Sequence, residues 1–93
     1  MFKHFNIRVF GRVKGVDFRA AAKSLAGELG IAGFAKNEDG DSVYIEAEGE
    51  EAALKIFLDW CRKGNSWSKV EKVESGEGEV KGYKGFSVIR SFL

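Results

Sequence analysis

Nine consecutive residues near the N-terminus carry the clearest chemical signal: Gly11-Arg12-Val13-Lys14-Gly15-Val16-Asp17-Phe18-Arg19. Two glycines four residues apart let the backbone turn sharply, because glycine adopts positive φ without a steric penalty. N–H groups of such a loop at the start of a helix form a site for an anion. A cation in the first helical turn, as at Arg19, is unfavourable by ~0.3–1 kcal/mol unless an anion lies nearby. The pattern indicates a phosphate site, and by itself it is also compatible with a purely structural turn.

This stretch resembles the active-site loop of the acylphosphatase family, G-x-V-Q-G-V-x-F-R. Lys14 replaces the usual glutamine, and Asp17 places an unusual carboxylate at the variable position. A second segment, Gly33-Phe34-Ala35-Lys36-Asn37 with Asp39-Gly40, resembles the family's G-[WYF]-V-x-N…D-G segment. A third, Gly85-Phe86-Ser87-Val88-Ile89-Arg90, resembles its C-terminal strand. The three segments follow the family's order and span nearly the whole chain.

The resemblance implies hydrolysis of acyl phosphates to a carboxylate and inorganic phosphate, without a metal or other cofactor. Arg19 matches the family's phosphate-binding arginine and Asn37 its water-orienting asparagine, so these two are the catalytic candidates. Gly11–Phe18 is the phosphate-binding loop. We therefore expect a small-molecule acyl phosphate as substrate, with inorganic phosphate as product and inhibitor.

The residue types suit this chemistry. The guanidinium of Arg19 is a planar fork of donors for phosphate oxygens, and the amide of Asn37 can hold a water in line with phosphorus. An asparagine before Asp-Gly also commonly bonds its own turn, and that alternative stays open. No nucleophile motif or metal-ligand spacing accompanies the pair. A carboxylate leaving group needs no general acid, because its conjugate acid has a pKa of ~4.

Hydrophobic periodicity predicts the order strand, helix, strand, strand, helix, strand, with one added strand. Asp17 is the predicted N-cap of the first helix, and Gly30 its left-handed C-cap. The predicted elements are a strand at 5–11, a helix at 18–29, strands at 31–37 and 43–47, a helix at 50–63, a weaker strand around 70–73, a mobile connection at 75–82 and a strand at 86–92.

This order predicts a ferredoxin-like α+β plait, a βαββαβ antiparallel sheet with two helices on one face, in a single domain of residues 1–93. The third strand would lie between the first two, which run in the same direction. Arg19 and Asn37 would then meet at one end of the sheet. His4 would lie roughly 26 Å from Arg12, at the opposite end.

Composition restricts the partners. Fifteen basic and fourteen acidic residues leave a net charge of +1, so we expect no nucleic-acid partner. We also expect no membrane partner, a cytoplasmic location and a monomer. Two groups of residues are predicted to pack in the interior: Cys61, Trp60 and Trp67, and the phenylalanines Phe5, Phe34, Phe57 and Phe86. The alternative function is a phosphate- or RNA-binding module on the same fold with little or no turnover, which the Asp17 charge would favour.

Overall fold

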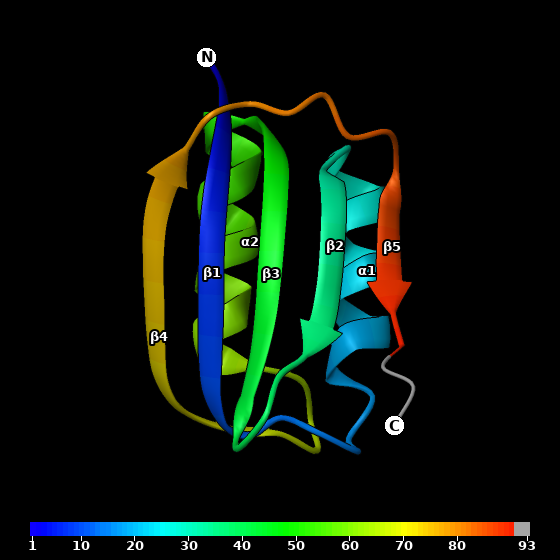
Figure 1. The fold of residues 1–93 in the computed structure, drawn as a ribbon, viewed down its shortest axis with the longest axis vertical. Coiled ribbons are helices and arrows are strands. Elements are labelled where there is room, and N and C mark those ends of the chain that lie inside the picture. The colour runs from blue at the N-terminus through cyan, green and yellow to red at the C-terminus, as the bar shows by residue number, and fades with distance from the viewer. Residues whose placement is uncertain (91–93) are drawn as a thin grey trace.

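A computed structural model describes residues 1–90 of the chain. It contains seven elements, which Figure 1 labels in chain order: β1 (Phe2–Arg12), α1 (Phe18–Leu29), β2 (Ala32–Asn37), β3 (Ser42–Glu50), α2 (Glu51–Lys63), β4 (Lys69–Gly78) and β5 (Phe86–Ile89). The strands form one five-stranded sheet in the order β4-β1-β3-β2-β5, and both helices lie behind it in this view. The predicted ferredoxin-like α+β fold is confirmed.

The sheet brings together strands that are distant in sequence. β3 is antiparallel to both β1 and β2, so β1 and β2 run in the same direction on either side of it, as predicted. β5 pairs with β2 in parallel, which makes the sheet mixed rather than wholly antiparallel. The last strand ends at Ile89 rather than at residue 92, and the remainder of the predicted strand beyond Arg90 lies outside the described residues.

The hydrophobic core lies between the sheet and the two helices. Alternate residues of β1 and β3 point into it, and each helix contributes one face. The principal members are Phe5, Ile7, Val9, Val43, Ile45, Ala47, Phe18, Ala22, Ala26, Leu54, Phe57, Leu58 and Cys61. Cys61 is buried in this core, as predicted, and burial raises the pKa of its thiol to about 12.

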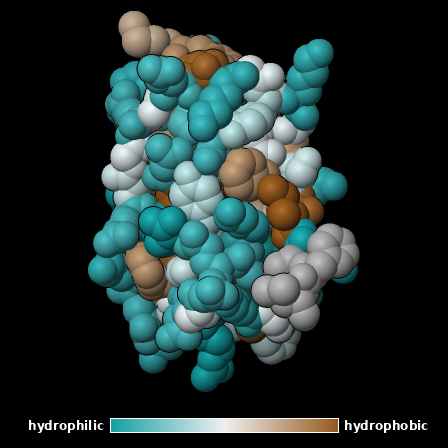
Figure 2. Space-filling model, in the orientation of Figure 1, coloured by the Kyte–Doolittle hydropathy of each residue, from teal (hydrophilic) through white to brown (hydrophobic). Residues whose placement is uncertain are grey.

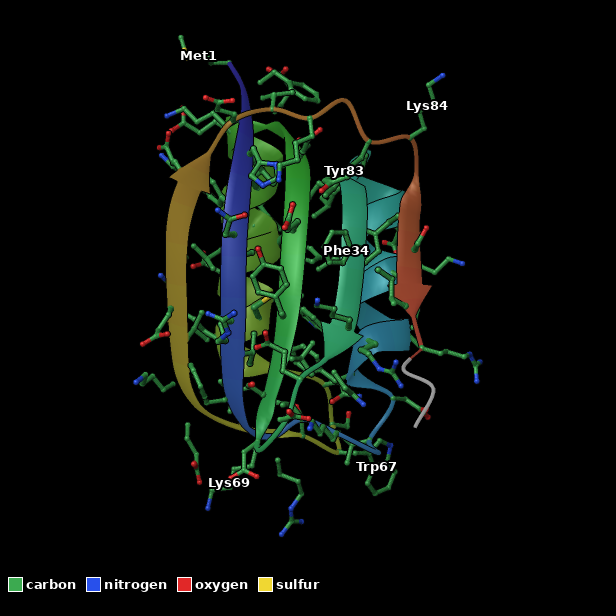
Figure 3. The ribbon with its side chains drawn as sticks, viewed as in Figure 1. Met1, Phe34, Trp67, Lys69, Tyr83 and Lys84 are labelled. Carbon is green, nitrogen blue, oxygen red and sulfur yellow. The ribbon has the colours of Figure 1, made fainter. Side chains whose placement is uncertain are left out.

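Of the four phenylalanines predicted in the core, Phe5 and Phe57 are buried there, and the other two are not. Phe86 is only partly buried and packs against the edge of the core. The core prediction for Phe34 is wrong. Its side chain lies on the face of the sheet away from the helices, where its ring meets that of Tyr83 edge-on with centroids 5.8 Å apart (Figure 3). Position 34 alternates with the buried Ala35, and the period of two in a strand fixes its direction.

The connection between β4 and β5 also differs from the prediction. β4 continues to Gly78, so the first part of the predicted mobile segment is strand. The rest crosses the end of the sheet where β1 begins (Figure 1). There the carboxylate of Glu48 accepts hydrogen bonds from the backbone N–H groups of Lys81, Gly82 and Tyr83, the last two at 3.0 and 3.1 Å. The glycine-rich composition suggested mobility, but a buried carboxylate holds this backbone.

Candidate active site

The stretch Gly11–Phe18, called the glycine loop here, leads from the end of β1 into α1. Gly11 lies at a bulge where β1 changes its register against β4. Its φ is +130°, and a Cβ at this position would lie 2.2 Å from the carbonyl oxygen of Lys69. Its N–H donates to the carbonyl of Asp41 at 3.0 Å. Only glycine lets β4 approach this closely, so the start of the loop is fixed by contacts from two other segments.

The rest of the glycine loop presents unpaired backbone donors. Val13 and Phe18 are each 1% exposed, so their side chains anchor the loop to the core. Between them the backbone turns outward. Among residues 1–90 no backbone acceptor takes a hydrogen bond from the N–H groups of residues 14–20, and the first paired N–H is that of Ala21, which donates to the carbonyl of Asp17 at 2.9 Å. Unpaired N–H groups at a helix start attract an anion.

Asp17 occupies the predicted N-cap position but does not act as predicted. Its side chain makes no capping hydrogen bond, and its backbone is left-handed, with φ 58° and ψ 23°. A carboxylate caps a helix from an extended backbone, because only then does it reach back to the N–H groups of the first turn. The prediction of a stabilising cap was therefore wrong. The first-turn donors remain available to another acceptor.

Arg19 lies in the first turn of α1, and its guanidinium points toward the end of β5. Its Nη1 donates to the carbonyl oxygen of Ile89 at 2.9 Å. The side chain borders a pocket of about 230 Å³, whose lining residues are Val13, Gly15, Asp17, Phe18, Arg19, Ala20, Val88 and Arg90. The hydrogen bond to β5 uses one guanidinium nitrogen, and the other donors of the fork remain for a ligand.

Arg90 is a second cation at this pocket that the sequence argument missed. The sequence pattern places Arg90 only in the segment that resembles the family's C-terminal strand. The parallel pairing of β5 with β2 brings the end of β5 beside the start of α1. That pairing depends on contacts between residues more than fifty positions apart, so no local pattern identifies it.

Asn37 is the last residue of β2 and lies opposite Val43 of β3. The parallel course of β1 and β2 places it at the same end of the sheet as the glycine loop (Figure 1). It does not line the pocket beside Arg19. Its Oδ1 is buried and has no hydrogen-bond partner among the described residues. A bond of this side chain to its own turn is also not observed within residues 1–90. A buried polar atom without a partner suggests a place for a water molecule.

Two side-chain hydrogen bonds fasten the glycine loop to neighbouring segments. Lys14 donates from Nζ to the backbone carbonyl of Glu38, the residue that follows Asn37. From the other side, Asn65, between α2 and β4, donates from Nδ2 to the carbonyl of Val16 at 2.7 Å. No local sequence pattern identifies this role of Asn65, because its partner lies 49 residues away. The bonds tie the loop to the β2–β3 turn and to the α2–β4 connection.

An ion pair supports the turn after Asn37. Arg8 donates from Nε to Oε1 of Glu38 at 2.6 Å and from Nη2 to Oε2 at 3.0 Å. This two-point contact, aided by a weaker bond from Ser42, lowers the pKa of the Glu38 carboxyl. The turn that carries Asn37 is therefore fastened to β1 by a carboxylate that stays ionised at neutral pH.

The single histidine of the sequence, His4, lies away from the glycine loop. The His4 ring is buried. Its Nδ1 is hydrogen-bonded to Oε2 of Glu48 at 2.7 Å, and its Nε2 to Oδ1 of Asn6 at 2.9 Å. His4 pairs across the sheet with Glu48 and Gly78, near the start of β1, which agrees with the predicted separation from Arg12.

No group of three or more His, Cys, Asp or Glu residues is placed to hold a metal ion in the described part of the chain. No helix within residues 1–90 is both long and apolar enough to span a membrane.

Comparison with known proteins gives a consistent result. The model of the Acylphosphatase family matches residues 5–88. An acylphosphatase of Ligilactobacillus salivarius is 40% identical over 87 residues, covering 92% of this chain and 97% of the relative. One from Thermus thermophilus is 45% identical over 80 residues, covering 86% and 91%. Among solved structures, the acylphosphatase from Bacillus subtilis is 37% identical, with a TM-score of 0.90 and coverage of 96% and 99%.

Proposed function

This chain belongs to the acylphosphatase family and is an enzyme of acyl phosphate hydrolysis, and from this premise we propose which of its residues perform the reaction. The glycine loop and Arg19 bind the phosphoryl group, and Asn37 orients the attacking water. Neither a metal nor a cofactor takes part. The observation that carries the proposal is the run of unpaired N–H groups at residues 14–20 beside the guanidinium of Arg19.

Binding of the phosphoryl group follows from the donors at the pocket. Loop N–H groups and the positive end of the α1 dipole attract the phosphate oxygens. Arg19 adds a fixed charge, and its bond to the Ile89 carbonyl holds the guanidinium in place before substrate arrives. Donors that are positioned in advance stabilise the charge that develops in the transition state without further reorganisation. The helix start thus supports both binding and catalysis.

Asn37 orients the nucleophile, a water molecule, in this proposal. Its Oδ1 has no partner among the described residues, so it is available to accept a hydrogen bond from a water. The amide does not act as a base, because it is not basic at neutral pH. The water attacks phosphorus, its proton passes to a phosphate oxygen of the substrate, and the P–O bond to the acyl group breaks. Carboxylate and inorganic phosphate result, and the catalytic contribution comes from positioning and charge stabilisation.

The remaining predictions about this protein belong to the same proposal. Residues 1–93 form a single acylphosphatase-like domain, and the single hydrophobic core found within residues 1–90 supports this. The substrate is a small molecule, inorganic phosphate competes with it, and the enzyme acts as a monomer in the cytoplasm without nucleic acid. Figure 2 shows a mostly hydrophilic surface over the face of the sheet that the helices leave uncovered. Acidic and basic side chains share that face, including Arg8, Glu46 and Lys72, which does not favour an RNA backbone.

The test is a comparison of Arg19→Ala and Asn37→Ala with the wild-type protein. Acetyl phosphate hydrolysis is measured in EDTA, with inorganic phosphate as the competitive inhibitor. Arg19→Ala should lower kcat/KM by roughly 10²–10³-fold, the usual effect of removing one transition-state donor, and should weaken inhibition by phosphate. Arg19→Lys should restore little, because an ammonium lacks the bidentate fork. Asn37→Ala should lower kcat while inhibition by phosphate stays near that of the wild-type protein.

The outcomes separate the roles. A folded Arg19→Ala protein with wild-type activity would refute the role of Arg19. Weaker inhibition by phosphate in Asn37→Ala, with kcat intact, would make Asn37 a binding residue. Loss of wild-type activity in EDTA that Mg²⁺ or Zn²⁺ restores would contradict the absence of a metal. A wild-type protein that binds phosphate but hydrolyses no acyl phosphate would support the alternative of a binding module.

A further inference from the structure

Trp67 is the most exposed aromatic side chain of the described residues. Its exposed fraction is 74%, whereas the next most exposed aromatic residue, Phe2, is at 52%. The packing predicted for both tryptophans holds only for Trp60, whose ring stacks on Phe18 with centroids 4.9 Å apart. A single exposed apolar side chain is ordinary in a folded protein. The position of Trp67, and the way its turn is held, are what distinguish it.

Trp67 lies in a tight turn between α2 and β4. The turn runs from Asn65 to Ser68, and it is closed by two hydrogen bonds to the Asn65 carbonyl: one from the Ser68 N–H at 3.2 Å and one from the Ser68 hydroxyl at 3.0 Å. Gly64, with φ +75°, allows the chain to fold back, since a Cβ there would lie 2.1 Å from the Ser68 Oγ. The turn therefore holds its backbone in one shape and presents the indole of Trp67 to solvent.

The same turn is attached to the glycine loop. Asn65 donates from Nδ2 to the carbonyl of Val16 at 2.7 Å. Two residues span at most about 7 Å, so the Cα of Trp67 lies within that distance of the Cα of Asn65. Figure 3 places Trp67 at the end of the molecule where β1 passes into α1. The exposed indole is thus carried on a segment that is hydrogen-bonded to the proposed phosphate-binding loop.

We infer that Trp67 contacts the acyl group of the bound substrate and favours acyl phosphates with an aromatic acyl group. The inference rests on the proposed function, in which the loop N–H groups and Arg19 hold the phosphoryl group. The acyl group of the substrate then extends from the pocket toward solvent, because the loop donors surround its phosphoryl group. An aromatic ring beside the indole removes apolar surface of both from water, and such ring pairs form offset-stacked or edge-to-face contacts.

The test compares two substrates that share the phosphoryl group and differ in the acyl group. KM and kcat are measured for acetyl phosphate and benzoyl phosphate with the wild-type protein, Trp67→Ala and Trp67→Phe. Trp67→Ala should raise KM for benzoyl phosphate about three- to tenfold, as expected for the loss of one aromatic pair. KM for acetyl phosphate should change less than about twofold. Trp67→Phe should recover most of the preference, because it restores a ring.

Phe2→Ala is the matched control, since it removes another exposed aromatic residue from the first position of β1, at the far end of the strand from the glycine loop. It should leave both KM values unchanged. If Trp67→Ala changes the ratio of the two KM values no more than Phe2→Ala does, the inference is wrong while the proposed function stands. If the wild-type protein hydrolyses neither substrate, the proposed function fails first, and the inference falls with it.

A readout that does not depend on turnover uses indole fluorescence. Benzoylphosphonate, a stable analogue of the aromatic substrate, should change the emission of the wild-type protein, and acetylphosphonate or inorganic phosphate should not. The change should disappear in Trp67→Phe, where Trp60 is the remaining tryptophan. An equal change in Trp67→Phe would assign the signal to Trp60 and overturn the inference.

Discussion

Substitution of Asp17 tests whether this side chain opposes the phosphate that its neighbours attract. The residue is exposed, makes no capping bond and borders the same pocket as Arg19. Asp17→Asn removes the charge and keeps a residue that tolerates the left-handed backbone. Asp17→Gly removes both the charge and any strain of the left-handed conformation. Comparison of the two variants separates the electrostatic contribution from the backbone contribution.

The size of the pocket sets the expected effect on binding. Asp17 lines this pocket of about 230 Å³. For a phosphate bound there, we take a separation on the order of 5–8 Å between its charge and the Asp17 carboxylate. At the dielectric constant of water this repulsion is ~0.5–1 kcal/mol. Asp17→Asn should therefore tighten inhibition by inorganic phosphate about two- to fivefold. The gain should shrink as salt is added, because both charges are exposed to solvent.

The backbone sets the expected effect on stability. A left-handed conformation costs a residue with a Cβ about 1 kcal/mol, and aspartate somewhat less. Glycine relieves that cost but loses more conformational entropy on folding, by roughly 0.5–1 kcal/mol. The free energy of unfolding of Asp17→Gly should thus stay within about 0.5 kcal/mol of wild type. The free energy of unfolding would fall clearly in Asp17→Ala and little in Asp17→Asn both if the carboxylate capped the helix and if the backbone is left-handed. Stability therefore does not separate these two explanations, and inhibition by phosphate is the measurement that tests the charge.

The assay is inhibition of acetyl phosphate hydrolysis by inorganic phosphate at low and high salt, with urea unfolding of each variant. Inhibition by phosphate that is unchanged or weaker in Asp17→Asn at low salt would refute the electrostatic reasoning. A tightening that persists at high salt would point to a change of loop geometry in place of charge.

Two further predictions concern residues that hold backbone in place. Asn65→Ala removes the Nδ2 donor to the Val16 carbonyl without adding a charge beside the loop. It should lower kcat/KM for acetyl phosphate roughly 5–10-fold, as expected for one lost hydrogen bond, and unchanged kinetics would contradict the bracing role. Burial by itself raises the pKa of Glu48, but bonds from the Lys81 N–H, the His4 ring and the next two N–H groups outweigh it, and the pKa is lowered. The stabilisation is then complete above the ordinary glutamate pKa of about 4.3 and is lost as pH falls through the lower pKa of the folded state. Glu48→Gln should reduce the free energy of unfolding at pH 7 by about 1.5–3 kcal/mol, and urea unfolding should show a smaller difference at pH 3; an equal difference at both pH values would contradict the ionised role.

Several features of this protein were determined by the sequence alone, because they depend on neighbouring residues. The alternation from Phe5 to Gly11 and the helical spacing after Phe18 predicted β1 and α1, since periodicity directly reports which face is buried. Asp39-Gly40, between the predicted strands at 31–37 and 43–47, is typical of the hairpin turn that joins β2 and β3. The three motifs in order predicted the family, which the comparisons confirmed. Local patterns therefore sufficed for most of the elements and for their order, and the resemblance to the family identified Arg19 and Asn37 as candidates.

Only the tertiary structure decided what surrounds those candidates. Arg19 meets the Ile89 carbonyl across 70 positions, and Asn65 meets the Val16 carbonyl across 49. The left-handed backbone of Asp17 depends on how the loop is held at both ends, so its residue type alone suggested a cap that does not form. Hydrogen bonds between distant segments leave no periodic pattern in the sequence, because the fold decides which two segments of the chain come together.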